Sequence, residues 1–579
     1  MKLFVLLSLL FFFIFIGSTE SILSLSFYDF VIVGSGAAGG IVADRLSAKG
    51  FTVLVLEAGG PSLGAFGGVD YVSSKGTYDP VTKVYTPNRP LTKYDVPFYF
   101  QSDSANGDKY DIQGTNLAKV IGGCGVHNAM VFMRGKTSDY DGWGVPGWDW
   151  NGIQPYFLKL ETILDSHLTS SANHGHDGII KVRSIPFDQE GADLISSCSA
   201  SGLPFNNDFY DDSRDGCGYF QFNIDEKGER CSSAHTYLLR ATKRSNVDLV
   251  TYASVSKIKW QYNFIKSKYE AVGVEYTKIG SQLTYTVTAF KEVILSAGAI
   301  NTPKILMNSG IGDSSYLNSF PHVSVIKNSP GVGKNLQNHF ISFNIWTYNK
   351  VNSRPDFYQT YSSTFEYQTS GTGIFATPGF SAGAFLRANE SSTEGESIMT
   401  IFPGILGGTS PIPSMTLAIS IAHPTKHPFQ QVKLNPDTSG TFSEFYKRPP
   451  IVQYDPTLVD EDMEILVRGI KESRRIMSYP PMSNYAAPVF PPAAISSDQD
   501  LKDFVKQNIQ LHDHWCGTAK MGPSSDPTSV VDSNLRVIGV DKLRVVDASV
   551  IPTIPNSLLH ATVLAIAEKA SDLILSDYI

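Results

Sequence analysis

The chain has 579 residues and a formal net charge of −8, which comes from 47 lysines and arginines against 55 aspartates and glutamates. This acidic balance argues against a protein that works by neutralising nucleic-acid phosphates, so we expect no nucleic-acid partner. Hydrophobic residues make up 42% of the chain and charged residues 18%, which excludes intrinsic disorder, and five cysteines are too few for a disulfide scaffold.

The N-terminus has the layout of a secretory signal. Lys2 precedes an apolar run over 3–16, and small and polar residues follow at 17–19. Because the run is too short to span a bilayer comfortably, residues 1–20 predict a signal peptide, with an uncleaved membrane anchor as the alternative. No later segment has the length and hydrophobicity of a transmembrane helix. We therefore expect a secreted, soluble mature protein without a transmembrane anchor.

Two further features depend on entry into a secretory pathway. Cys217 and Cys231 bracket a short segment and form a candidate disulfide pair, for which spacing alone is weak evidence. Asn389, followed by Glu390 and Ser391, forms a glycosylation sequon. Both features are meaningful only if the chain is exported.

A dinucleotide-binding turn follows the first predicted strand. Residues 27–33 read as a buried strand, the sequence GSGAAG follows at 34–39, and a helical pattern continues to Gly50. In this context Gly34 permits a tight turn, Gly36 lets the backbone approach a pyrophosphate, and Gly39 lets helix and strand pack closely. The strand, turn and helix together predict a site for FAD or NAD, between which the turn does not discriminate.

A second predicted strand, 52–56, ends at Glu57. A carboxylate about 20 residues beyond the glycines can accept both ribose hydroxyls, which favours an adenosine ribose without a 2′-phosphate.

Seven later segments carry glycines, histidines and short polar motifs. They are 122–130 (GGCGVHNAM), 134–135 (RG), 139–143 (DYDGW), 296–312 (SAGAINTPKILMNSGIG), 330–339 (PGVGKNLQNH), 514–522 (HWCGTAKMG) and 543–549 (LRVVDAS). In this order, and across nearly the whole mature chain, they resemble the glucose-methanol-choline (GMC) family of flavin oxidoreductases. The resemblance implies that the cofactor is FAD.

The resemblance also implies the fold. We expect an α/β protein with a Rossmann-like FAD-binding domain and an inserted α+β substrate domain built on an antiparallel sheet. The expected FAD-binding parts are 27–160, 226–339 and 501–579, the last with the catalytic segment, and the expected substrate-domain parts are 161–225 and 340–500. Alternating runs at 414–421 and 432–434 predict strands of the substrate domain.

The predicted FAD contacts combine the turn residues with the family segments. They are Gly34, Gly36, Gly39, Glu57, Gly122, Gly123, His127, Asn128 and Asp547. In some family members a histidine at the position of His127 is bonded covalently to the flavin; the alternative is a noncovalent site where His127 packs or hydrogen-bonds. A helical pattern over 562–575 follows Asp547 and predicts a carboxylate and a helix N-terminus near the polar end of the cofactor.

The catalytic assignment begins with the proton that hydride transfer leaves on an alcohol. A base that removes this proton increases the rate by roughly 10² to 10⁴, and neutral imidazole is suited to the task. His514 aligns with the catalytic histidine of the family. His512 would share a face with it in an extended segment. A metal site at this His-x-His pair is the weaker alternative because the sequence offers no third ligand, so no metal is expected.

The sequence departs from the family at a second catalytic position. Family members carry His or Asn there, to hydrogen-bond the substrate oxygen, but the position falls on Leu558. Leucine can neither donate nor accept a hydrogen bond, so His560 or, less favoured, Asn556 takes this part, or His514 acts alone.

Together these features predict a secreted FAD-dependent oxidoreductase that oxidises a CH–OH group of an alcohol or sugar. Hydride passes to flavin N5 with His514 as general base, and oxygen or a quinone-like acceptor reoxidises the flavin. The alternatives are a hydroxynitrile lyase of the same fold and a catalytically silent flavin-binding protein.

Overall fold

The computed structural model describes residues 27–69, 71–101, 109–281, 283–348, 361–387, 395–403, 414–437, 439 and 441–579. The predicted signal peptide at 1–20 and the sequon at 389–391 lie outside these residues. No helix within the described ranges has the length and hydrophobicity needed to cross a membrane.

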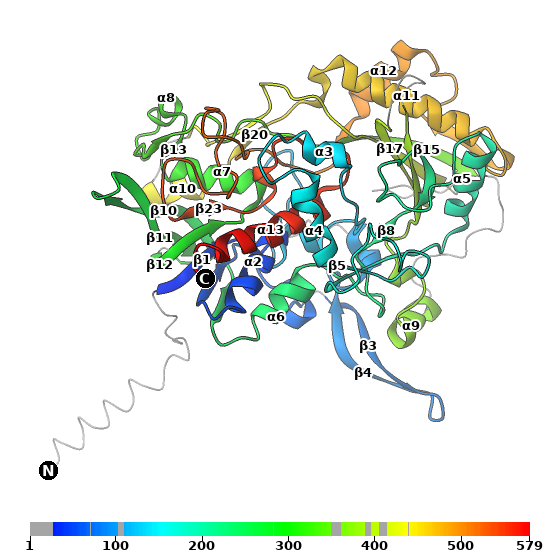
Figure 1. The fold of residues 1–579 in the computed structure, drawn as a ribbon. Coiled ribbons are helices and arrows are strands. Elements are labelled where there is room, and N and C mark those ends of the chain that lie inside the picture. Colours follow the sequence, from blue (N-terminus) through cyan, green and yellow to red (C-terminus); the bar gives the residue numbers. More distant parts are fainter. Residues whose placement is uncertain are drawn as a thin grey trace.

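Two large sheets organise the chain, and they lie on opposite sides of the view in Figure 1. The first is a mixed sheet with the order β10-β11-β12-β1-β2-β9, and β23 pairs with β12. Strands β23, β12, β1, β2 and β9 form the parallel part of the sheet. On its other edge β12 pairs antiparallel with β11, and β11 pairs antiparallel with β10. Its strands are β1 (Phe27–Val33), β2 (Val53–Leu56), β9 (Val247–Val250), β10 (Ala253–Asn263), β11 (Lys268–Lys278), β12 (Thr284–Leu295) and β23 (Leu543–Val545).

The parallel strands form because both of their faces are covered. Val31, Ile32 and Val33 of β1 and all four residues of β2 are buried, as continuous apolar runs in parallel sheets usually are. Helix α2 (Ala37–Ser47) follows β1 and packs against α13 (Leu559–Leu575). The predicted strand–turn–helix unit is therefore confirmed, and it brings the C-terminal helix beside the first one.

The second sheet is antiparallel, with the order β21-β15-β18-β17-β16-β7, and β22 pairs with β15. Its strands are β7 (Gly216–Tyr219), β15 (Phe340–Tyr348), β16 (Ala382–Leu386), β17 (Ser397–Pro403), β18 (Ser414–Ile421), β21 (Ala486–Phe490) and β22 (Gln510–Leu511). The expected strand at 414–421 is β18, and the expected antiparallel sheet is confirmed.

The two faces of this sheet bury different sets of side chains. Met415, Leu417 and Ile419 of β18 belong to a core that contains side chains of α11, whereas Ala418 belongs to a separate apolar cluster on the other face. This alternation follows from the two-residue period of a strand. Helices α5 (Gln189–Ala200), α11 (Asp460–Met477) and α12 (Asp498–Asn508) lie on the outer side (Figure 1). The opposite face of the sheet is not covered by these three helices and is therefore available to form the wall of a binding site.

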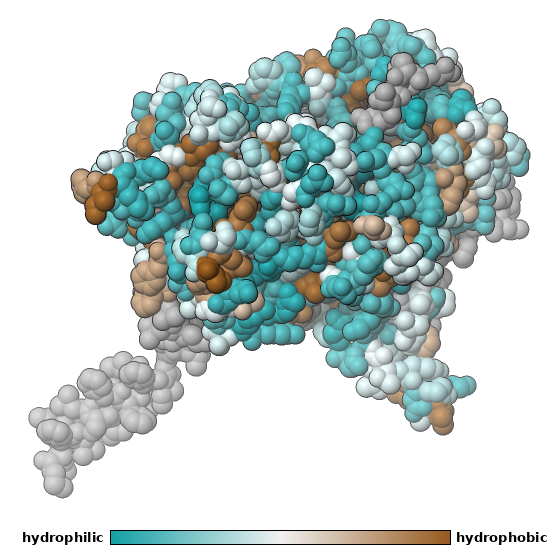
Figure 2. Space-filling model, in the orientation of Figure 1, coloured by the Kyte–Doolittle hydropathy of each residue, from teal (hydrophilic) through white to brown (hydrophobic). Residues whose placement is uncertain are grey.

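Shorter elements connect and flank the two sheets. The remaining helices are α3 (Thr137–Asp141), α4 (Trp150–Leu160), α6 (Leu239–Ala241), α7 (Gly298–Asn308), α8 (Ser314–Leu317), α9 (Tyr361–Ser370) and α10 (Phe442–Lys447). The remaining strands are β3 (Tyr71–Asp79), β4 (Val84–Thr92), β5 (Glu161–Ile163), β6 (Ile180–Ser184), β8 (Gln221–Phe222), β13 (Ile311–Gly312), β14 (Lys327–Asn328), β19 (Gln431–Lys433) and β20 (Ile451–Gln453). The β3–β4 hairpin projects from the body, and its tip, which carries the exposed Val81, is hydrophobic in Figure 2.

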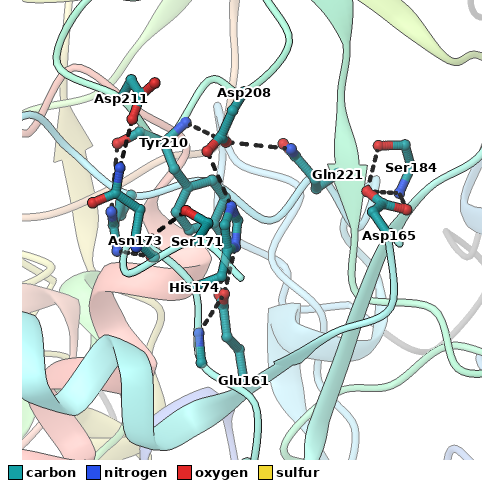
Figure 3. Close-up of polar contacts among 12 residues, drawn as sticks. Glu161, Asp165, Ser171, Asn173, His174, Ser184, Asp208, Tyr210, Asp211 and Gln221 are labelled. Carbon is teal, nitrogen blue, oxygen red and sulfur yellow. Dashed lines mark hydrogen bonds and ion pairs between the residues drawn. The ribbon is translucent and has the colours of Figure 1, made fainter. Parts of the chain in front are cut away.

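A buried cluster of charged side chains connects the loops between α4 and β7. His174 lies between Glu161 and Asp208, with Nδ1 2.6 Å from Glu161 Oε1 and Nε2 3.2 Å from Asp208 Oδ2 (Figure 3). Because carboxylates only accept, both ring nitrogens must carry protons, so His174 is an imidazolium. The two carboxylates raise the pKa of His174 to about 9, although burial alone would lower it. We call Glu161, His174 and Asp208 the His174 cluster.

The predicted pairing of Cys217 with Cys231 is wrong. Cys217, on β7, forms a disulfide with Cys198, on α5. Cys231 is a buried free thiol that accepts a hydrogen bond from the Lys181 backbone N–H at 3.2 Å. Proximity in the sequence misled the prediction, because α5 packs against β7 and β16 and brings Cys198 to Cys217.

Candidate active site

The glycine turn leaves open space beside the N-terminus of α2. Gly34 has φ +100°, and a side chain there would meet the Ser296 carbonyl oxygen at 2.4 Å. A side chain at Gly39 would meet the Gly34 oxygen at 2.0 Å, so both positions require glycine. Next to Gly36, in contrast, no atom lies within 4 Å of the site of a Cβ. The helix therefore begins at an open position with unpaired N–H groups, which suits an anion.

Glu57 lies at the end of β2 and is held by the same turn. Its Oε2 accepts hydrogen bonds from the Ser35 N–H at 3.0 Å and from Ser35 Oγ at 2.7 Å, and Oε1 accepts from the Gly59 N–H at 2.7 Å. Burial raises the pKa of Glu57 against these hydrogen bonds. Among the described residues, Oε1 accepts only the hydrogen bond from Gly59 and retains a lone pair, so the fixed carboxylate can still accept from a ribose hydroxyl.

The segment that contains Gly122 and Gly123 passes over the glycine turn. Gly122 donates its N–H to Ser35 Oγ at 3.2 Å, and the Cβ position of Gly123 lies 3.2 Å from Gly36 Cα. Both glycines have positive φ, at +89° and +51°. The structure thus brings together two predicted glycine segments that are separated by more than 80 residues.

His127 and Asn128 follow on this segment. His127 is half-buried, and its Nε2 lies 3.4 Å from Asn116 Nδ2. Asn128 Oδ1 accepts from the Met130 N–H at 3.0 Å and from Arg230 Nη1 at 2.9 Å.

Asp547 organises the N-terminus of α7. One oxygen accepts from the Gly298 N–H at 2.9 Å and from Thr302 Oγ1 at 2.6 Å, and the other accepts from the N–H and Oγ of Ser549 at 2.8 and 2.5 Å. Because the chain itself supplies four donors, Asp547 positions this end of α7 rather than offering a free carboxylate.

Orphaned buried polar atoms beside these segments test whether the site fits a flavin dinucleotide. Arg230 is only 1% exposed, and its Nε and Nη2 have no hydrogen-bond partner. His560 Nε2 is buried without a partner as well, and Arg230 contributes to lowering the pKa of His560 to about 4, after desolvation. Unpaired buried donors are costly, so an electron-rich polar partner fits them. The open position at Gly36 and these orphaned groups suit a flavin dinucleotide.

The predicted base lies on the loop that follows β22. Strand β22 pairs with the start of β15, and the His512 N–H donates to the His339 carbonyl at 3.0 Å. Asp513 then takes the left-handed conformation, with φ +56°, and the His514 N–H donates to Asn338 Oδ1 at 2.7 Å. Strand pairing therefore places residues 338 and 339 beside 512–514.

The rings of His512 and His514 lie side by side, with centroids 4.2 Å apart, although Asp513 between them is not extended as the prediction assumed. His512 Nδ1 lies 3.4 Å from Ser420 Oγ. A third ring, His339, places its Nδ1 3.0 Å from His514 Nδ1. We call His339, His512 and His514 the histidine triad.

Hydrogen bonding fixes the tautomer of His514. His339 Nε2 lies 3.0 Å from the Ala422 carbonyl oxygen, which can only accept, so Nε2 carries the proton of neutral His339. His339 Nδ1 is then an acceptor, and His514 Nδ1 must donate to it. The second nitrogen of His514, Nε2, is left with a free lone pair.

The histidine triad is neutral. Desolvation, with smaller contributions from His512 and His339, lowers the pKa of His514 well below 6.5. Desolvation also lowers the pKa of His512 to about 4 and that of His339, which His512 lowers further, to about 3. Three imidazoles this close raise the question of a metal, but no group of three or more metal-ligating side chains in the described ranges could hold an ion. The Nδ1 atoms of His339 and His514 are instead joined by a hydrogen bond.

The segment before α13 presents Leu558 to the cavity beside His514. Asn556 points elsewhere: its Nδ2 donates to the Gly395 carbonyl at 3.1 Å. His560 lies in the first turn of α13, with Cε1 3.3 Å from the Cβ position of Gly125. Neither Asn556 nor His560 lines the cavity, so neither replaces the polar side chain that the family carries at position 558.

The cavity is formed between the inner face of the antiparallel sheet and the loops that carry His514 and Leu558. It is lined by Ala129, Val131, Phe220, His339, Ile341, Phe380, Ile398, Thr400, Phe402, Ala418, Ser420, His512, His514 and Leu558. An apolar cavity with a few converging polar groups is typical of a small-molecule site.

Sequence reasoning missed two residues of this region. His339 is not among the predicted site residues, although it ends the family segment 330–339. Arg230 was not singled out, and its charged and polar surroundings at 225–233 give no local signal of burial. Both act through contacts over more than 100 residues, which local patterns do not reveal.

Comparison with known proteins agrees with these observations. A family model described as GMC oxidoreductase matches residues 28–341, and a second one, for the C-terminal part, matches residues 443–567. An oxygen-dependent choline dehydrogenase from Photobacterium profundum is 30% identical over 564 residues, which cover 95% of this chain and 93% of that protein.

Solved structures show the same fold. Pyridoxine 4-oxidase from Mesorbium loti superposes with a TM-score of 0.74 and 25% identity, over 94% of this chain and 98% of that one. An FAD-dependent oxidoreductase from Chaetomium thermophilum gives a TM-score of 0.78 at 24% identity, over 95% and 99% of the two chains.

Proposed function

Because the chain belongs to the GMC oxidoreductase family, we propose that it is a secreted FAD-dependent enzyme that oxidises an alcohol, with His514 as the general base. The observation that carries this proposal is the free lone pair of His514 Nε2 on the wall of an apolar cavity. The glycine turn, Glu57 and the orphaned donors of Arg230 and His560 support FAD as the cofactor.

In the proposed mechanism the chain holds the alcohol, removes its proton and excludes water. The apolar walls hold the body of the substrate and direct its hydroxyl toward His514. His514 Nε2 accepts the hydroxyl proton, and the hydrogen bond from Nδ1 to His339 keeps the ring in the required tautomer. The chemistry that bound FAD supplies is acceptance of a hydride from the alcohol carbon. Oxygen or a quinone-like acceptor then serves as the final oxidant.

Anaerobic mixing of the purified protein with alcohols tests the redox reaction directly. We expect the flavin absorbance near its visible maximum to bleach, because the alcohol reduces the cofactor. A hydroxynitrile lyase of the same fold would use His514 without net redox chemistry and would not bleach. Failure of every alcohol to bleach the flavin or to reduce a dye acceptor would contradict the proposal.

We also propose that FAD is attached covalently through His127. The support is the position of His127 on the segment that passes over Gly36 and its half-buried ring. Protein that is precipitated with acid and treated with SDS should keep its flavin fluorescence, and His127→Asn should lose it. Complete release of flavin from the unmodified protein would identify a noncovalent site.

Secretion is proposed on the apolar run at 3–16 and on the disulfide between Cys198 and Cys217. Stable disulfides are typical of oxidising compartments. Expression of the full chain in a secretory host should yield protein in the medium, with a new N-terminus near residue 20. Retention of the complete N-terminus on a membrane would indicate the anchor instead.

A further inference from the structure

Among the described residues, none that lines the cavity beside His514 carries a carboxylate. Its lining contains imidazole, hydroxyl and hydrocarbon groups, and none of the described residues that line it is acidic or permanently charged. The polar groups are the histidine triad, Ser420 and Thr400. A substrate at this site therefore meets neutral partners.

The remaining wall is aromatic and aliphatic. Phe380 and Phe402 pack with their ring centroids 4.5 Å apart, and Phe220 lines the same cavity. These rings belong to one apolar cluster against which Leu558 is packed. The family resemblance led us to expect a polar contact to the substrate at position 558. Because this position is leucine, the aromatic and aliphatic wall of the cavity offers the substrate no hydrogen bond there.

The polar end of the cavity does not supply negative charge either. His514 donates through Nδ1 to His339, and the proton of His339 is directed at the Ala422 carbonyl. The nearby Asp139 is engaged elsewhere: its carboxylate accepts from the Asn556 N–H at 3.0 Å and lies 3.1 Å from His423 Nε2. The cavity thus combines one proton acceptor with an uncharged, mostly apolar enclosure.

We propose that this cavity selects an uncharged alcohol with an apolar body and discriminates against alcohols that carry a quaternary ammonium group. The inference rests on the proposed function, whose site it shares. A cation moved from water into such an enclosure loses its hydration without gaining an ionic partner. Contact with phenylalanine faces recovers only part of this loss, because a cation–π contact is weaker than an ion pair with a buried carboxylate. An apolar body keeps the full benefit of desolvation.

A pair of isosteric probes isolates the charge. Choline and 3,3-dimethyl-1-butanol have nearly the same shape, but only choline is charged. For the holoenzyme we expect kcat/KM for the neutral alcohol to exceed that for choline by about 100-fold, the factor that an uncompensated charge produces when it costs a few kcal/mol. Benzyl alcohol, which is also neutral and apolar, should be a substrate. Equal values for the two isosteres, or a preference for choline, would overturn the inference.

An introduced carboxylate provides the matched variant. Thr400 lies on β17 and lines the cavity, so Thr400→Glu adds a charge and Thr400→Gln adds the same bulk without it. We expect Thr400→Glu to shift the ratio of the two kcat/KM values toward choline by at least about tenfold relative to Thr400→Gln. The same shift in both variants would contradict the role assigned to charge. The comparison of isosteres on the unmodified enzyme stands even if Thr400→Glu does not fold.

A binding measurement separates this inference from the proposed function. Each isostere is mixed rapidly with the oxidised holoenzyme without oxygen, and the perturbation of the flavin spectrum that precedes any bleaching gives its dissociation constant. Tighter binding of 3,3-dimethyl-1-butanol without any turnover would support the selectivity and contradict alcohol oxidation. Turnover of both alcohols with a preference for choline would support oxidation and overturn the selectivity.

Discussion

His514 and His174 differ in the side chains that surround them. His174 is held between the carboxylates of Glu161 and Asp208, and its pKa rises to about 9. The side chains that act on the pKa of His514 are two other imidazoles, and desolvation, with a smaller contribution from them, lowers this pKa well below 6.5. Burial acts in the same direction on both, so the presence or absence of carboxylates decides the sign. One histidine is a structural cation and the other is a neutral proton acceptor.

Replacing His514 should produce the largest effect. His514→Ala removes the proton acceptor, so we expect the rate of anaerobic flavin reduction by alcohol to fall by about 10² to 10⁴. FAD content should stay unchanged, because His514 is assigned to the substrate. His167→Ala, at an exposed histidine, is the control and should leave the rate unaltered. A near-normal rate for His514→Ala would remove the proposed base.

The His174 cluster should control stability instead of rate. The rise of the His174 pKa from 6.5 to about 9 corresponds to about 3 kcal/mol of folding free energy. This contribution is complete below pH 6.5 and is lost as the pH rises toward 9. The histidine triad changes stability in the opposite direction. As the pH falls below 6.5, its histidines bind protons in the unfolded chain but remain neutral in the folded protein, so the free energy of unfolding declines.

The two clusters together predict a maximum of stability near pH 6.5. Thermal unfolding of the holoenzyme between pH 5 and pH 9 measures it as a maximum in the transition temperature. His174→Gln should lower the transition temperature and flatten its decline above pH 6.5, while the decline on the acid side remains. An unchanged alkaline decline in His174→Gln would mean that other groups cause it.

A smaller effect is expected from His339, which acts through His514. His339→Phe removes the acceptor for His514 Nδ1–H, so the catalytic tautomer is no longer enforced, and we expect kcat to fall roughly tenfold to 100-fold with little change in KM. His339→Asn can present an amide oxygen to the same N–H and should recover part of the loss. If both variants lose the same activity, His339 serves packing and not the tautomer.

Local patterns in the sequence predicted the elements better than their contacts. The strands at 27–33 and 414–421 form with the predicted bounds, because each is an uninterrupted apolar or alternating run. The last helix begins at Leu559 instead of 562, and its N-cap position is Leu558, whose side chain cannot cap the helix and so does not mark its start.

Contacts between distant residues follow from sheet pairing, which local periodicity does not specify. The resemblance to a family located His514, but His339 reaches it only because β22 pairs with β15. Packing between distant segments is equally hidden from local patterns: Arg230 donates to Asn128 across 102 residues, and Cys217 forms a disulfide with Cys198 instead of Cys231. The candidate base was therefore predictable, whereas the group that orients it was not.

The smallest effect, and the sharpest test of the contrast between the two histidines, is the pH dependence of catalysis. A base with an ordinary imidazole pKa of 6.5 would lose about tenfold in kcat/KM between pH 7.5 and pH 5.5, because most of it would be protonated at the lower pH. The pKa of His514 lies well below 6.5, so it stays neutral over this interval, and we expect less than about a twofold change in anaerobic flavin reduction.

The measurement uses an uncharged alcohol, so that only the enzyme titrates. In His339→Phe the flat profile should persist at a lower rate, since desolvation is the main cause of the lowered pKa and His339 a minor one. A decline with a midpoint near pH 6.5 in the unmodified enzyme would show that the site, when loaded with FAD and substrate, hydrates or charges His514, and the distinction from His174 would no longer rest on their neighbours.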